Sequence, residues 1–174
     1  SMDVVKHADE LKREADSIIT QSGVVDVLSG LGKINFVGSY ALDLLHRNDI
    51  DIIVTSNICS RDLAIFATKK FIESNKYQTV GFANYVDYNT PYLHGYYWEL
   101  IIVKDDVKWK FDVWYTAEEK VKTIEVTQII LDKLATNKNA RKKILEQKQK
   151  YFDGEKYSHD MNGLKIYEQV LGKI

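Results

Sequence analysis

The chain has 174 residues, and its 45% hydrophobic and 28% charged content suits one globular core. A formal net charge of −1 provides no basic excess for neutralising a long run of phosphates, which argues against long nucleic acid as a partner and disfavours a general polymerase. The single cysteine, Cys59, excludes an internal disulfide, so we expect a reducing, cytoplasmic setting. No apolar run approaches the length of about 20 residues that crosses a bilayer, so no membrane association is expected.

The N-terminal part of the chain has a helical pattern. Asp3 is a suitable N-cap, and apolar residues then recur at helical spacing until Gly23 ends the helix. A short second helix is predicted over residues 24–28, and a strand over residues 34–37.

A pair of acidic residues then interrupts a run of apolar ones. If the chain is extended from Asp49 to Val54, side-chain alternation directs Asp49 and Asp51 to one face and Ile50 and Ile52 to the core. Two carboxylates in one small volume repel each other. A divalent cation relieves that repulsion, and Mg²⁺ prefers carboxylate oxygens together with substrate phosphates.

Gly38 and Ser39 lie between the strand predicted over residues 34–37 and the strand that begins at Asp49. A glycine directly after a strand lets the backbone approach a ligand, and Ser39 is expected to open a helix over residues 40–46. The first N–H groups of such a helix have no intrahelical partners and favour an anion. The sequence therefore predicts a phosphate group opposite the two carboxylates.

The middle of the chain predicts a helix followed by strands. Ser60 or Asp62 is expected to cap the helix, and residues 78–88 have strand-like aromatic and β-branched content. The segments "YYWELIIV" and "VKWKFDVWY", separated by "KDD", predict two antiparallel strands joined by a polar turn.

The second strand of this hairpin carries an isolated acid. Alternation places Lys108, Lys110 and Asp112 on its polar face. If this strand neighbours the Asp49–Asp51 strand on the same side, three carboxylates converge, enough for two metal ions about 3.5–4 Å apart. A salt bridge from Asp112 to either lysine is the competing interpretation.

From Ala117 onward the pattern is helical, and no linker or repeat marks a flexible boundary. We therefore expect an α/β (α+β) fold with a mixed β-sheet flanked by helices. Residues 1–116 would form the core, and residues 117–174 a C-terminal helical region packed on it in a single compact unit.

The stretch "GSYALDLLHRNDID" resembles the signature of the DNA polymerase β-like nucleotidyltransferases. In that superfamily Gly-Ser precedes an Asp-x-Asp on a strand, and a third Asp follows on a later strand. The corresponding residues here are Gly38, Ser39, Asp49, Asp51 and Asp112.

The resemblance implies an enzyme that transfers a nucleoside monophosphate from a nucleoside triphosphate, most simply ATP, to a hydroxyl group, with release of pyrophosphate. Asp49, Asp51 and Asp112 would hold two Mg²⁺ ions, with Mn²⁺ as an alternative, and Asp112 would also help to deprotonate the hydroxyl. Gly38 and Ser39 would hold the triphosphate. Given the near-neutral charge, we expect a small-molecule or protein acceptor, and the helical tail or a second subunit, as in a homodimer, would complete the pocket.

Some positions leave the interpretation open. Lys110 could contact the triphosphate or compensate charge at the surface, and the loop around His94 could stack on an acceptor ring. Asp43 and Asn48 depart from the superfamily pattern, which has a small residue and a serine there, so a catalytically inactive binding protein is one alternative. A D-x-D glycosyltransferase is another, although only 48 residues precede Asp49.

Overall fold

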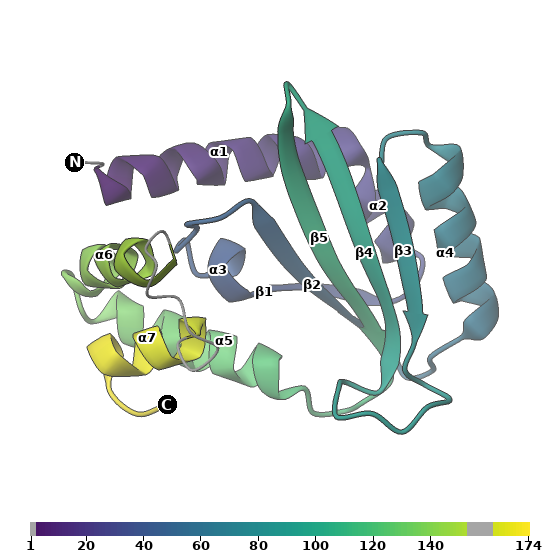
Figure 1. The fold of residues 1–174 in the computed structure, drawn as a ribbon. Helices are drawn as coiled ribbons and strands as arrows, with labels where there is room; N and C mark the ends of the chain where they lie inside the picture. The colour runs from purple at the N-terminus through teal and green to yellow at the C-terminus, as the bar shows by residue number, and fades with distance from the viewer. Residues whose placement is uncertain (1–2, 153–161) are drawn as a thin grey trace.

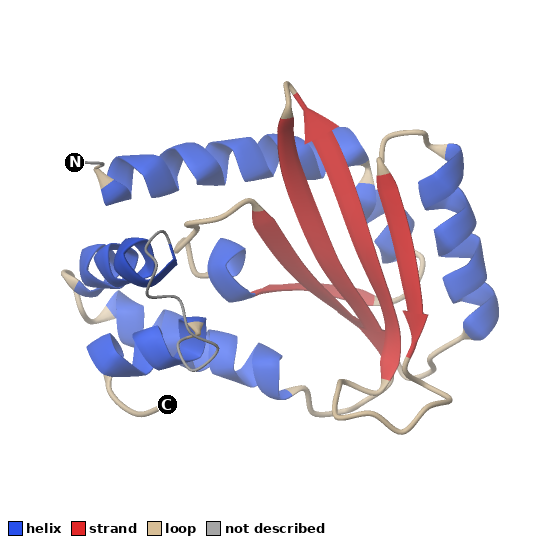
Figure 2. Ribbon diagram, viewed as in Figure 1, coloured by secondary structure: helices blue, strands red, loops and turns tan. Residues whose placement is uncertain are grey.

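The computed structural model describes residues 3–152 and 162–174. Helices flank a central sheet in the described chain (Figure 2). In chain order the elements are α1 (Val4–Ser22), α2 (Val24–Ser29), β1 (Lys33–Val37), α3 (Gly38–Ala41), β2 (Asp49–Thr55), α4 (Arg61–Glu73), β3 (Thr79–Asn84), β4 (Gly95–Lys104), β5 (Val107–Thr116), α5 (Lys122–Ala135), α6 (Ala140–Phe152) and α7 (Gly163–Leu171).

The sheet has five strands in the order β1-β2-β5-β4-β3. Strands β2 and β5 are parallel, whereas β1 with β2, β5 with β4 and β4 with β3 are antiparallel. The predicted α/β (α+β) class, with a mixed sheet and flanking helices, is therefore confirmed.

One face of the sheet is covered by α1, α2 and α4, and α4 lies beside the edge strand β3 (Figure 1). The apolar side chains of β2 and β5 on this covered face are buried; they are Ile50, Ile52, Val54, Phe111 and Val113. Because side chains alternate along a strand, the residues between them lie on the opposite face, which we call the open face.

A second apolar cluster joins the N-terminal end of α1 to the C-terminal helices. Its buried members are Val4, Ala8, Leu42, Leu44, Ile130, Ile144, Leu145, Ile166 and Tyr167. Helices α5, α6 and α7 gather beside α3 (Figure 1). The C-terminal helices are thus held next to the turn that links β1 to β2.

Several local predictions are confirmed. The Asp3 carboxylate accepts hydrogen bonds from the first turn of α1, and Gly23 ends that helix in the left-handed conformation. Ser60 caps α4. Strands β4 and β5 form the predicted hairpin, and both turn residues, Asp105 and Asp106, have positive φ angles, as the right-handed twist of a two-residue hairpin requires.

Three predicted boundaries are wrong. The helix expected over residues 40–46 is a single turn, α3, because Asp43 adopts a left-handed φ of 57°. Strand β3 covers only Thr79–Asn84 of the predicted 78–88, since Val86 and Asp87 turn back onto the Asn84 side chain. The helical pattern from residue 117 becomes a helix only at Lys122.

In the described part of the chain, no helix combines the length and apolar character needed to cross a membrane.

Gly95, at the start of β4, allows close contact with β5. A Cβ atom there would lie 2.3 Å from the Tyr115 carbonyl oxygen. We expect Gly95→Ala to lower the free energy of unfolding by about 1–3 kcal/mol, because backbone atoms must move apart. Gly30→Ala is the matched control, since its Cβ would meet the Val27 carbonyl at an ordinary 3.6 Å. Urea unfolding measures both, and equal stability of the two variants would contradict the prediction.

Candidate active site

The turn after β1 brings the backbone against a carboxylate. Gly38 has a φ of +66°, and a Cβ atom on it would lie 2.7 Å from Oδ2 of Asp51. Any other residue would meet both backbone strain and this carboxylate. Glycine is therefore strongly favoured at this position, and the turn lies in direct contact with the D-x-D strand.

The parallel pairing of β2 with β5 sets the carboxylates side by side. Asp51 is the register partner of Asp112, and Asp49 is the partner of Lys110. In a parallel pair, register partners project from the same face about 4.8 Å apart. The adjacency that the sequence left open is thus found in the structure.

Asp112 is held by two neighbours. Tyr97 donates its hydroxyl to Oδ1, and Lys110 Nζ lies 3.3 Å from Oδ2. Within the described ranges, no group of three His, Cys, Asp or Glu side chains is arranged to hold a metal ion. Metal binding by Asp49, Asp51 and Asp112 therefore stays a prediction, and so does nucleotide contact by Lys110.

The electrostatics of the acidic residues favour a bound cation. Burial, followed by repulsion from Asp112 and Asp49, raises the pKa of Asp51 to about 7. Burial also raises the pKa of Asp49, although Lys110 and Arg47 oppose that rise. Two neighbouring carboxylates with this excess of negative charge fit the oxygen ligands that Mg²⁺ takes.

A buried lysine that the sequence did not single out lies opposite the carboxylates. Lys148 of α6 is 2% exposed, and its Nζ donates to Ser39 Oγ at 2.8 Å and to the Leu44 carbonyl at 2.7 Å. Burial lowers its pKa to about 7, and attraction to Asp51 opposes that change. The detectable signal was its position, because Lys148 continues the buried stripe of Ala140 and Ile144 at intervals of four residues.

Ser39 is also contacted from α7. The Tyr167 hydroxyl lies 3.3 Å from Ser39 Oγ, and the Lys148 ammonium lies 5.0 Å from the centre of the Tyr167 ring. Burial raises the pKa of Tyr167 to about 12, so its hydroxyl keeps its proton at neutral pH. Side chains from two C-terminal helices therefore fix the predicted phosphate-binding serine.

The two departures from the superfamily pattern have structural explanations. Arg141 donates to the Asp43 carbonyl at 3.0 Å and lies 3.4 Å from its carboxylate, while also pairing with Asp9. Asp43 is thereby partly neutralised. Asn48 donates to the Lys108 carbonyl and accepts from the Lys110 backbone, extending the β2–β5 pairing.

Asp51 lines two cavities. One, of about 190 Å³, is lined by Ser39, Leu45, His46, Arg47, Asp49, Asp51, Lys148, Phe152 and Gly163. The other, of about 500 Å³, is lined by Gly38, Asp51 and Asp112 together with Trp114, Tyr92, Leu93 and the first residues of α5. The larger volume is within the range of small-molecule sites.

No protein-family model and no curated protein sequence matches the chain. Solved structures do match it. The Cid1 poly(U) polymerase, described with Mg and 3′-dATP bound, is 14% identical with a TM-score of 0.64, covering 95% of this chain and 52% of that one.

Two further solved structures are similar to this chain at low sequence identity. The polymerase core of the TRAMP RNA surveillance complex is 18% identical (TM-score 0.57), with 91% of this chain and 48% of that chain covered. The GLD-2–GLD-3 non-canonical poly(A) polymerase complex is 8% identical (TM-score 0.59), with 96% and 57% covered. The chain thus spans about half the length of the proteins it matches. Residues 3–152 and 162–174 have the fold of the DNA polymerase β-like nucleotidyltransferases.

Proposed function

We propose that the chain transfers a nucleoside monophosphate from a nucleoside triphosphate, with ATP as the first choice, to a hydroxyl group of a small-molecule or protein acceptor. The observation that carries this proposal is the pairing of Asp51 with Asp112 directly against the Gly38 turn. The nucleotidyltransferase fold supports it, as does the Mg and 3′-dATP named for the Cid1 structure.

The smaller cavity is the proposed triphosphate site. The Ser39 hydroxyl and the Lys148 ammonium both line it and both can donate to phosphate oxygens. A buried ammonium interacts strongly with an anion because little water screens the charge. The Gly38 turn would bring the backbone alongside the triphosphate.

Carboxylate oxygens are the ligands that Mg²⁺ prefers, and we propose that Asp49, Asp51 and Asp112 hold two Mg²⁺ ions, with Mn²⁺ as an alternative. When bound, the metal would neutralise phosphate charge and stabilise the oxygens that gain negative charge. Asp112 would exchange its ion pair with Lys110 for the metal, and Lys110 would then be available to a phosphate oxygen.

The reaction is a displacement at the α-phosphorus. The acceptor oxygen forms a bond to that phosphorus, the bond to the bridging oxygen breaks, and pyrophosphate leaves. Asp112 is the proposed acceptor of the hydroxyl proton. Positioning and charge neutralisation supply most of the rate acceleration in such reactions.

An inactive nucleotide-binding protein is the second candidate. It is favoured by the ion pair between Lys110 and Asp112 and by the lack of a three-carboxylate cluster in the described residues. The D-x-D glycosyltransferase alternative receives no support from the nucleotidyltransferase fold. Such an enzyme would release a nucleoside diphosphate instead of pyrophosphate.

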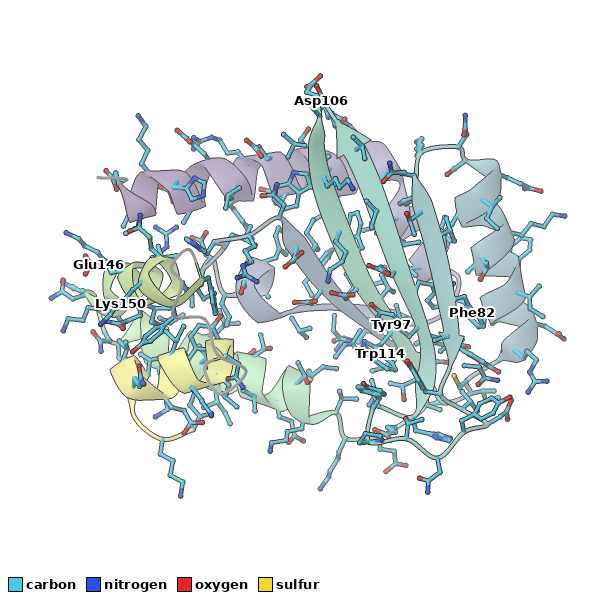
Figure 3. All side chains as sticks on the ribbon, viewed as in Figure 1. Phe82, Tyr97, Asp106, Trp114, Glu146 and Lys150 are labelled. Atoms are coloured by element: carbon cyan, nitrogen blue, oxygen red, sulfur yellow. The ribbon has the colours of Figure 1, made fainter. Side chains whose placement is uncertain are left out.

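Asp51→Asn is expected to remove activity. With ATP, Mg²⁺ and a panel of hydroxyl acceptors, we expect the wild type to release pyrophosphate and the variant to do so at least about 100-fold more slowly. Asp106→Asn, at the distant hairpin tip (Figure 3), is the matched control and should keep the wild-type rate. ATP-induced stabilisation without pyrophosphate release would support the inactive alternative.

Burial of Asp51 and its repulsion by Asp112 and Asp49 predict a pH-dependent gain in stability when its charge is removed. Its pKa is raised from 3.8 to about 7 on folding, so the folded state binds more protons than the unfolded state between these pH values. Stability therefore falls as pH rises from 4 to 7. Without ligands, Asp51→Asn should raise the melting temperature by a few degrees at pH 8 and not at pH 4. An equal gain at both pH values would contradict this origin.

Lys148→Met tests the phosphate side of the site. We expect ATP with Mg²⁺ at 100 times its Kd to stabilise the wild type by about 2.7 kcal/mol, which is several degrees in melting temperature. The variant should lose most of that shift, because it lacks the buried ammonium. Lys150→Met, on the exposed side of the same helix (Figure 3), should keep it. Identical shifts in both variants would remove Lys148 from the site.

A further inference from the structure

The larger cavity lies at Asp51 and Asp112 but is not lined by Ser39 or Lys148. If the triphosphate occupies the smaller cavity, as proposed above, the larger one is the space left for the acceptor. The residues that line it therefore indicate the chemistry of the acceptor.

Four aromatic rings follow one another beside this cavity, and two of them, Trp114 and Tyr92, line it. Ring centres are 5.0 Å apart from Tyr97 to Trp114, 5.4 Å from Trp114 to Tyr85 and 5.2 Å from Tyr85 to Tyr92. Tyr97 and Trp114 lie next to each other on β4 and β5 (Figure 3). The row starts at Asp112, to which Tyr97 donates, and ends at the exposed Tyr92.

Such a row offers ring faces on which a flat ligand can stack. Stacking of a base on an aromatic side chain contributes about 1–3 kcal/mol. Trp114 and Tyr92 line the cavity, whereas the other two tryptophans, Trp98 and Trp109, are buried in the covered face. Leu93 and Val121 complete an apolar wall beside Trp114.

Two lysines, Lys120 and Lys122, line this cavity together with the acidic residues Glu118, Asp51 and Asp112. Among residues 3–152 and 162–174, neither lysine has an ion-pair partner. An anionic group on the ligand would supply one.

We propose that the larger cavity binds the acceptor, and that this acceptor is a small hydroxyl compound with a flat aromatic or heteroaromatic ring and an anionic group. The inference rests on the proposed function. The ring stacks on Trp114, the anionic group lies near Lys120 and Lys122, and the hydroxyl lies at Asp112. In the reaction, the acceptor oxygen forms a bond to the α-phosphorus, pyrophosphate leaves, and Asp112 accepts the hydroxyl proton.

Calorimetric titration without ATP or metal tests the cavity separately from catalysis. Uridine 5′-monophosphate, which has ring, hydroxyl and phosphate, should bind at least tenfold more tightly than ribose 5-phosphate, which lacks the ring. Trp114→Leu should abolish this preference while keeping an apolar side chain at this position. Tyr88→Leu, an exposed aromatic outside the cavity lining, should preserve it.

A second set of titrations tests the two lysines. The double variant Lys120→Gln, Lys122→Gln should weaken uridine 5′-monophosphate by about tenfold and leave uridine unchanged, whereas Lys108→Gln should affect neither. Wild-type binding of the monophosphate by Trp114→Leu would overturn the proposal.

Pyrophosphate release separates this inference from the proposed function. Stimulation of release from ATP and Mg²⁺ by the monophosphate, and not by ribose 5-phosphate, supports both. If binding depends on Trp114 but no acceptor stimulates pyrophosphate release from ATP, the transfer reaction and the acceptor role are refuted. The assignment of a ring-binding cavity then still holds. Release that is unaffected by Trp114→Leu overturns the inference alone.

Discussion

Repulsion between Asp51 and Asp112 is the constraint around which the rest of the site is arranged. The two residues are register partners on parallel strands, and a shift of one residue would expose the whole apolar face of β2. The repulsion therefore cannot be relieved by sliding a strand. It is relieved by neighbours instead, since Lys110 and Tyr97 bind Asp112 and the absence of a side chain at Gly38 leaves room for the Asp51 carboxylate.

The sequence predicted the parts of this site that depend on local spacing. Alternation placed Asp49 and Asp51 on one strand face, and a glycine after a strand marked the Gly38 turn. It could not place Asp112 beside Asp51. That pairing requires β5 to lie between β2 and β4, although two further strands and a helix separate β2 from β5 along the chain, and no local pattern records strand order.

The remaining parts of the site depend on contacts between residues that are far apart in the sequence. Lys148 and Tyr167 reach Ser39 across 109 and 128 residues of sequence. The helix predicted over residues 40–46 failed for a related reason: Leu42 packs in the C-terminal cluster, whereas Leu45 packs against the sheet. Residues three apart on an α-helix share a face, so a continuous helix could not place both side chains where they are buried. Tertiary packing overrode local propensity here.

Two opposite charges lie in this site, on the buried Lys148 and the partly buried Asp51, and each group is shifted toward its neutral form. Burial brings the pKa of Asp51 up, and that of Lys148 down, to about 7. Neither shift favours folding near neutral pH, so the apolar clusters on both sides must compensate for them. A cation would relieve Asp51, and a phosphate group would relieve Lys148. A nucleotide alone would add negative charge near Asp51, and a metal alone would add positive charge near Lys148. The arrangement therefore favours the metal and the nucleotide binding together over either one binding separately.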